Sequence, residues 1–294
     1  MLMKLPNNIT NTVLSKYEKF PIALTGCMTT DHALKCCEYD FAIATSEHGN
    51  ELLHVNDDYA EILKISTKLN PYRVAIALHN MQIINDPSWT LASLKQQLDT
   101  IIGKALSWYA RNRTVDALFY ANRAKESAKS NVLLSSLWLK CAAYHYLEAV
   151  LARNGMRPMP THMLAQLRSL TDKTAGEGIV LASSCLGLER ANKSSVSRCM
   201  EASIGLNDKI KQDYSTKIVV KKSQYLYDSG MYTDCYFYLG YISRNAVTSI
   251  ASNQRALRDY THMISIAMDL TTDQSFALKL SKELLDSCNM LLKK

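Results

Sequence analysis

The sequence changes its pattern close to residue 90, and this change limits the folds that the chain can adopt. Before it, apolar runs are short and polar turns separate them. After it, apolar residues recur at helical spacing through most of the remaining chain. Only 10 glycines and 6 prolines in 294 residues argue against a loop-rich or all-β fold. We therefore predict an α+β protein with a small mixed β-sheet domain over residues 1–88. An all-helical bundle domain over residues 89–294, divided again near residue 172, is expected to follow.

The first part carries the signals of a small mixed sheet. Asn56-Asp57-Asp58 is typical of a hairpin turn, and Asn70-Pro71 is typical of a helix start. The expected elements, in chain order, are a helix over 11–20, a strand over 22–25, a helix over 29–37, strands over 39–45, 51–55 and 59–66, a helix over 70–79 and a strand over 81–84.

The second part is predicted to be a series of helices. The segment 132–153 is apolar almost all round, which places it at the centre of the bundle. Its Lys140, His145 and Glu148 indicate a buried helix rather than a membrane span, and we expect a cytoplasmic protein that does not bind a membrane. The other expected helices cover 90–109, 114–129, 161–170, 178–188, 194–204, 209–229, 232–244, 249–268 and 273–292.

The eight cysteines are too few in a chain of this length to form a disulfide scaffold. Most lie in apolar surroundings, so we expect reduced, buried thiols.

Residues near the start suggest a site. Leu24-Thr25-Gly26-Cys27 reads as a strand running into a turn, and Glu38 and Asp40, separated by one residue, lie at the start of the next expected strand. Residues i and i+2 of a strand project to the same face, so both carboxylates can reach one divalent cation. Backbone amides in a small-residue turn can bind phosphate. Together these are the parts needed for metal-assisted phosphoryl or nucleotidyl transfer.

This order of elements and motifs resembles the polymerase-β-type nucleotidyltransferase superfamily, in the form of a minimal domain fused to a helical domain. The family pattern is Gly-Ser in a turn, Asp-x-Asp on the next strand and a third acid on a later strand. The resemblance implies Mg²⁺ with a nucleoside triphosphate as substrate, and Glu38 and Asp40 as catalytic metal ligands. It also implies that Thr25, Gly26 and Cys27 lie at the phosphates. Met81 to Pro87 resembles the end of such domains.

The sequence departs from the family pattern at two positions. Cys27 replaces the serine, and a thiol is a weaker donor to phosphate than a hydroxyl. Glu38 replaces an aspartate and is longer by one methylene. For the third acid we predict Glu61, because a glutamate on the apolar face of a strand is costly unless it has a partner. Asp57 and Asp58 are the alternatives, although both belong to the expected turn.

Two functions follow from this sequence. The first is a Mg²⁺-dependent transfer of a nucleoside monophosphate, from ATP or another triphosphate, to a hydroxyl of a small molecule, RNA or protein. The second is a catalytically inactive protein of the same fold that serves as a protein- or RNA-binding scaffold or as an antitoxin-like partner. Residues 1–90 carry a net charge of −3 and the remainder +10. This asymmetry is compatible with RNA or a protein bound by the helical part and with ordinary solvated lysines. An oligomer is compatible with both functions.

Overall fold

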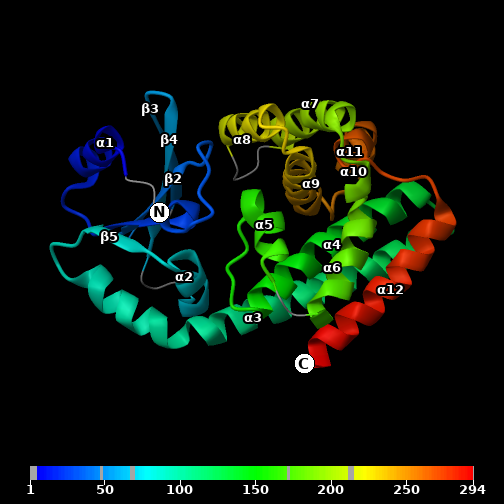
Figure 1. The fold of residues 1–294 in the computed structure, drawn as a ribbon, viewed down its shortest axis with the longest axis horizontal. Coiled ribbons are helices and arrows are strands. Elements are labelled where there is room, and N and C mark those ends of the chain that lie inside the picture. Colours follow the sequence, from blue (N-terminus) through cyan, green and yellow to red (C-terminus); the bar gives the residue numbers. More distant parts are fainter. Residues whose placement is uncertain (1–4, 47–48, 67–69, 171–172, 211–214, 294) are drawn as a thin grey trace. The chain divides into compact units, whose positions relative to one another are not determined.

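The computed structural model describes residues 5–46, 49–66, 70–170, 173–210 and 215–293 (Figure 1). The chain forms two compact units, Met1–Trp108 and Tyr109–Lys294. The division falls inside one long helix, α3 (Thr90–Ser127). The predicted boundary at residues 88 and 89 lies between the last strand, which ends at Asn85, and the start of α3. Residues 171 and 172, at the expected further division, lie outside the described residues.

The first unit contains a five-stranded mixed sheet. Its strands are β1 (Ile22–Thr25), β2 (Tyr39–Ala44), β3 (Gly49–Val55), β4 (Asp58–Ile65) and β5 (Gln82–Asn85). The strand order is β3-β4-β2-β1-β5. β2 and β4 are parallel, whereas the other neighbouring strands are antiparallel. The prediction of a small mixed sheet followed by helices is therefore confirmed.

One face of this sheet packs against two helices of the same unit. Helix α2 (Pro71–Ala77) begins as predicted, because the Asn70 side chain accepts a hydrogen bond from the Tyr72 amide at 2.9 Å and Pro71 fits the first turn. Ala23 and Ala42 form a buried cluster with residues of α2 and of the first half of α3, including Leu98. Small side chains on the strands let the helices approach closely, and this core holds the end of the sheet in place.

The predicted helix over 29–37 is wrong. The chain instead forms a short 3-10 helix, η1 (Gly26–Thr29), and then turns without regular structure up to β2. The hydroxyl of Thr29 donates to the Gly26 carbonyl at 2.9 Å, and that of Thr30 donates to the Cys27 carbonyl at 2.8 Å. Such local side-chain bonds compete with helix formation in a segment this short.

The N-terminal helix is also displaced from its predicted place over 11–20. Helix α1 (Asn7–Tyr17) begins directly after Pro6, whose fixed φ angle suits the residue before a helix. The helix is attached to the sheet by Glu51 on β3, which accepts hydrogen bonds from Lys16 and from the Tyr17 hydroxyl.

The second unit is helical, with α4 (Val132–Arg153) as its most buried element. All residues of α4 from Ser135 to Ala152 are buried, which confirms the predicted central helix. The other elements are η2 (Pro160–His162), α5 (Met163–Arg168), α6 (Lys173–Leu186), η3 (Leu188–Arg190), α7 (Lys193–Ile210), α8 (Thr216–Asp228), α9 (Tyr232–Ser249), α10 (Gln254–Asp259), α11 (Thr261–Ala267) and α12 (Gln274–Lys293).

Several helix predictions in this part are wrong. Helix α6 begins five residues earlier than expected, and α7 and α9 end six and five residues later. A separate helix over 114–129 does not exist, because α3 continues through Arg111-Asn112-Arg113, where no Gly or Pro interrupts it. The helix expected over 249–268 is two helices, with Tyr260 between them. The helix expected over 209–229 begins only at Thr216, and residues 211–214 lie outside the described residues.

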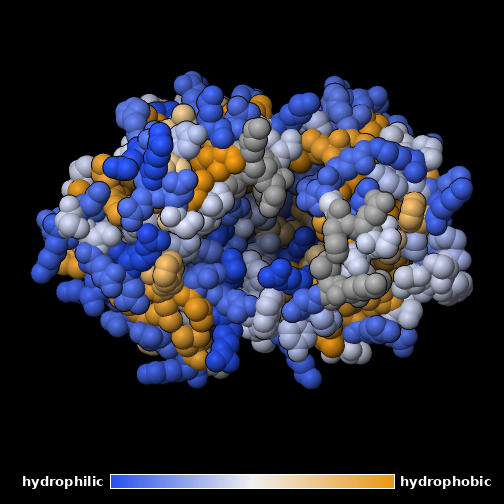
Figure 2. Space-filling model, turned by 180° about the vertical axis from the view of Figure 1, so that it is seen from behind, coloured by the Kyte–Doolittle hydropathy of each residue, from blue (hydrophilic) through white to orange (hydrophobic). Residues whose placement is uncertain are grey.

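None of the described helices is long and apolar enough to cross a membrane. On the face drawn in Figure 2, hydrophilic residues surround smaller apolar patches.

Candidate metal and phosphate site

Three carboxylates meet at one end of the sheet in the first unit. Asp40 is the second residue of β2 and lies opposite Glu61 on the parallel strand β4. Glu38 directly precedes β2, two residues before Asp40. One oxygen from each of the three side chains lies within 4.8 Å of the other two. The structure thus brings together all three acids that the sequence suggested as metal ligands, including the one from the later strand.

Three negative charges at this spacing repel one another. At 4.8 Å, each pair of full charges costs on the order of 3–4 kcal/mol at an effective dielectric constant of ~20. Glu38 is buried, and Asp40 and Glu61 are half-buried, so water screens these charges less than on an open surface. A divalent cation or a proton would offset this repulsion.

The donor set fits a hard divalent cation. Mg²⁺ binds oxygen ligands at about 2.0–2.1 Å in an octahedron, which places ligand oxygens about 3–4 Å apart. The carboxylate oxygens of Glu38, Asp40 and Glu61 all lie within 4.8 Å of one another, which is close to this spacing. A set made only of oxygens favours Mg²⁺, Mn²⁺ or Ca²⁺ over metals that prefer nitrogen or sulfur.

Gly26 forms the turn beside these carboxylates. Its φ angle is +75°, a conformation that favours glycine. A Cβ atom at this position would lie 1.8 Å from Oδ2 of Asp40, so a side chain here would collide with the carboxylate. The antiparallel register places Thr25 opposite Asp40. The backbone of the turn therefore lies directly against one member of the carboxylate trio.

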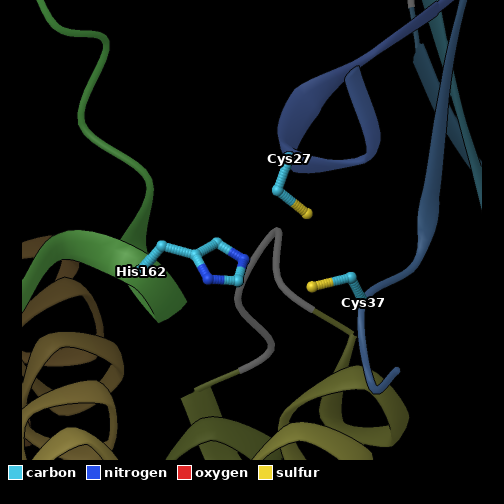
Figure 3. Close-up of side chains that lie close together, drawn as sticks. All are labelled: Cys27, Cys37 and His162. Atoms are coloured by element: carbon cyan, nitrogen blue, oxygen red, sulfur yellow. The ribbon is translucent and has the colours of Figure 1, made fainter. Parts of the chain in front are cut away.

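The two other residues predicted at the phosphates have structural contacts of their own. The hydroxyl of Thr25 donates to the Ala77 carbonyl at 2.8 Å and so attaches the end of α2 to the sheet. The thiol of Cys27 is buried, and its sulfur lies within 4.8 Å of the sulfur of Cys37 (Figure 3). The Thr25 side chain thus helps to fix the turn, and the backbone of Gly26 lies against Asp40.

A pocket of about 400 Å³ opens in the same unit beside the turn. Its lining residues are Thr29, Ala75, Leu78, His79, Asn80, Met81, Gln82, Lys95, Leu98, Asp99 and Ile102. Thr29 belongs to η1, and Gln82 lies opposite Leu24, the residue before Thr25. Gln82 lies on β5 and Asp40 on β2, and β1 runs between these two strands. The two residues are therefore about two strand spacings, or roughly 10 Å, apart. Sequence reasoning missed this pocket, because its walls come from three separate segments: Thr29, residues 75–82 and residues 95–102.

The second unit holds a separate buried polar cluster that the sequence reasoning also missed as a unit. Glu148 on α4 forms an ion pair with Arg244 on α9 at 3.2 Å, and His145 lies 3.3 Å from Glu148. The Tyr241 hydroxyl donates to Glu148 at 2.8 Å. His145 is a buried core residue with hydrogen-bond partners, since Arg244 Nη1 also lies 3.2 Å from its ring nitrogens.

Burial and charge shift the protonation of this cluster. Burial, together with the charge of Arg244, lowers the pKa of His145 to about 4, which leaves the ring neutral at pH 7. Burial alone would raise the pKa of Glu148, but the charge of Arg244 and the hydrogen bond with His145 hold it well below its usual range. The cluster is therefore a compensated buried ion pair in the core of the helical unit.

The sequence matches no protein-family model and no curated protein sequence. Comparison of folds finds the crystal structure, at 1.90 Å resolution, of a nucleotidyltransferase-like protein from Exiguobacterium sibiricum. The two chains are 12% identical, and the match covers 86% of this chain and 89% of that chain with a TM-score of 0.39. At this TM-score the similarity carries no argument about activity or substrate.

Proposed function

We propose that this protein is a Mg²⁺-dependent nucleotidyltransferase that transfers a nucleoside monophosphate from a triphosphate to a hydroxyl acceptor. The observation that supports this most strongly is the convergence of Glu38, Asp40 and Glu61 within 4.8 Å beside the Gly26 turn. A divalent cation bound between the three carboxylates would offset the repulsion of their charges.

The three carboxylates would hold the metal, since their oxygens fit its ligand preference. Magnesium bound there would favour ionisation of the acceptor hydroxyl and offset the charge of the leaving pyrophosphate. The backbone of the η1 turn would donate amide hydrogen bonds to the phosphates, as turns of this kind do for anions. The rest of the site positions these groups: Thr25 attaches α2 to the turn, and the core under Ala42 fixes β2.

The pocket beside η1 would hold the nucleoside. Its volume of about 400 Å³ is in the range of small-molecule sites. Leu78, Leu98 and Ile102 offer apolar surface for the faces of a base, while Asn80 and Gln82 offer amide groups for its edge. A distance of roughly 10 Å between Gln82 and Asp40 is comparable to the separation of a base and its phosphates.

A thermal unfolding series tests the proposal. ATP, GTP, CTP and UTP are added separately, each with and without Mg²⁺, and the melting temperature is followed. We expect at least one triphosphate to raise it only when Mg²⁺ is present, because ligands that bind the folded state stabilise it. Asp40→Ala should abolish this increase. Asp57→Asn, which removes an exposed acid from the hairpin turn of β3 and β4, should retain it.

The second candidate function is a scaffold without catalysis. Cys27 and Glu38, which replace the residues of the family pattern, favour it. Absence of a Mg²⁺-dependent shift with all four triphosphates would support the scaffold and contradict the transferase. Leu98→Trp, which fills the pocket, separates the two parts of the proposal. If it weakens nucleotide binding without changing Mg²⁺ binding, the pocket holds the nucleoside. If nucleotide binding is unchanged, the nucleoside lies elsewhere.

A further inference from the structure

Two cysteine thiols lie where the chain enters the candidate site. Cys27 follows Gly26 in η1, and Cys37 precedes Glu38 at the start of β2. The two cysteines are not joined by a disulfide in this structure, and both are buried, with exposed fractions of 7% and 2%. Their sulfurs lie within 4.8 Å of each other, and Figure 3 shows both directed into the same space. Both cysteines belong to the first unit, whereas His162, also labelled there, belongs to the second.

The segment between the two cysteines is suited to close a bond. A disulfide holds its sulfurs ~2.05 Å apart, so the two atoms must approach by a few ångströms at most. The chain from Thr30 to Glu38 contains no helix or strand, and it can move at lower cost than a sheet strand. Closing so short a loop also costs little chain entropy. The Cys37 sulfur already lies 3.4 Å from the Leu34 amide, within this loop.

We propose that Cys27 and Cys37 form a reversible oxidation site, at which a peroxide converts the two thiols into an intramolecular disulfide. Cys27, the more exposed of the two, reacts first. Its sulfur attacks one peroxide oxygen, the O–O bond breaks, and with hydrogen peroxide one water leaves, which gives a sulfenic acid. The Cys37 sulfur then attacks the Cys27 sulfur, the S–O bond breaks, and a second water leaves with the Cys37 proton. Each sulfur loses one electron, and the peroxide gains two. A dithiol reductant reverses the reaction by thiol–disulfide exchange.

Disulfide formation would change the neighbouring carboxylate site, and this consequence rests on the proposed function. Movement of Cys27 carries Gly26 with it, and there is no space for atoms between Gly26 and Oδ2 of Asp40. Movement of Cys37 carries Glu38. We therefore expect the oxidised protein to bind Mg²⁺ at least tenfold more weakly than the reduced protein, and dithiothreitol to restore the affinity.

The disulfide is detected without reference to activity. The full-length protein is treated with hydrogen peroxide, its remaining thiols are blocked, and it is digested with trypsin without reduction. Cleavage after Lys19, Lys35 and Lys64 places Cys27 in one peptide and the two other cysteines of this region in the next. We expect a linked pair of peptides whose mass is their sum less two hydrogens and which separates in dithiothreitol. Fragmentation should place the bond at Cys37.

Cys36 provides the matched control, because it is as buried as Cys37 and adjacent to it. The link should persist in Cys36→Ser and disappear in Cys37→Ser. A link through Cys36, or oxidation of Cys27 to the sulfinic acid without a link, would overturn the proposal. Fragmentation of the linked peptides from the wild-type protein also shows whether the bond is at Cys36 or Cys37. The test therefore does not depend on whether either variant folds.

Calorimetry of Mg²⁺ binding to the reduced and oxidised protein then tests the consequence for the site. If the disulfide forms but Mg²⁺ binds equally well, the oxidation site stands and its coupling to the carboxylates is contradicted. If the reduced protein binds no Mg²⁺, the proposed function fails, whereas the oxidation site does not.

Discussion

Asp40 on β2 lies directly opposite Glu61 on β4, in the parallel register of the two strands. Since β2 and β4 are not consecutive along the chain, the hairpin strand β3 must run outside β4 to allow this pairing. This strand order places Glu61, from the second strand of the hairpin, beside Glu38 and Asp40 at the start of β2. Gly26 closes the same group from the β1 side.

The first prediction concerns the contact between Gly26 and Asp40. Gly26→Ala should destabilise the protein by about 2–4 kcal/mol, because the new methyl group meets the carboxylate and the φ angle is unfavourable. Urea denaturation measures the free energy of unfolding. The matched control is Gly155→Ala, where φ is +76° but no atom lies within 4 Å of the added Cβ. It should cost about 1 kcal/mol. Equal costs at both positions would contradict the collision with Asp40.

The second prediction concerns repulsion within the carboxylate trio. Asp40→Asn removes one of the three charges without changing the shape of the side chain. Without a divalent cation, this variant should be as stable as the wild type or more stable, by up to about 2 kcal/mol, because repulsion decreases. Addition of Mg²⁺ should reverse the order, since only the wild type gains binding energy. Urea denaturation with EDTA and with Mg²⁺ provides the comparison. A destabilised Asp40→Asn variant in EDTA would show that Asp40 stabilises the fold through other contacts.

The third prediction concerns the buried ion pair of the helical unit. Arg244→Met should cost about 3–5 kcal/mol, because it leaves the buried charge of Glu148 without its main counterion. The double variant Arg244→Met/Glu148→Leu should cost clearly less than the sum of the single changes. The control is Arg255→Ala, which removes an exposed pair with Asp259 and should change stability by less than about 1 kcal/mol. Additive costs in the double variant would contradict direct coupling.

The fourth prediction concerns acid sensitivity. The unfolded chain protonates His145 with a pKa near 6.5, whereas burial and the charge of Arg244 lower the pKa in the folded protein to about 4. Between these values the unfolded state binds more protons, so the free energy of unfolding should decrease as the pH falls from about 6.5 to 4. Glu148, whose folded pKa is also lowered, adds to the loss below about pH 4.5.

Urea denaturation at several pH values measures this slope. His145→Gln should have a shallower slope between pH 6.5 and 5, because glutamine does not titrate. An unchanged slope in this variant would assign the acid sensitivity to groups other than His145.

The sequence predicts much of this fold because its local signals are strong. Asn56 takes a positive φ angle in the hairpin turn, and Asn70-Pro71 starts α2, as these residue types favour. The segment 132–153 is apolar almost all round and becomes the core helix. Where signals were weak, the predictions are wrong, as for the helix over 29–37, in which threonine side chains bond to the local backbone.

The candidate site was suggested by the sequence only in part. The spacing of Glu38 and Asp40 predicts that both carboxylates can reach one cation. Glu61 is predicted as the third ligand because an unpartnered glutamate on the apolar face of a strand is energetically costly. The parallel pairing that unites them depends on strand order, which local patterns do not encode. The approach of Cys37 to Cys27 depends on the irregular path of the loop between them, and the pocket beside η1 depends on packing between segments far apart in the sequence. Their residues carry no motif of their own.

The proposed metal site is tested most directly by a calorimetric titration of the reduced protein with Mg²⁺, in parallel with Asp40→Asn and Asp57→Asn. We expect saturable binding to the wild type and to Asp57→Asn, and at least a tenfold loss of affinity in Asp40→Asn. Equal Mg²⁺ affinity in all three proteins, or no binding to any of them, would contradict a metal site formed by Glu38, Asp40 and Glu61.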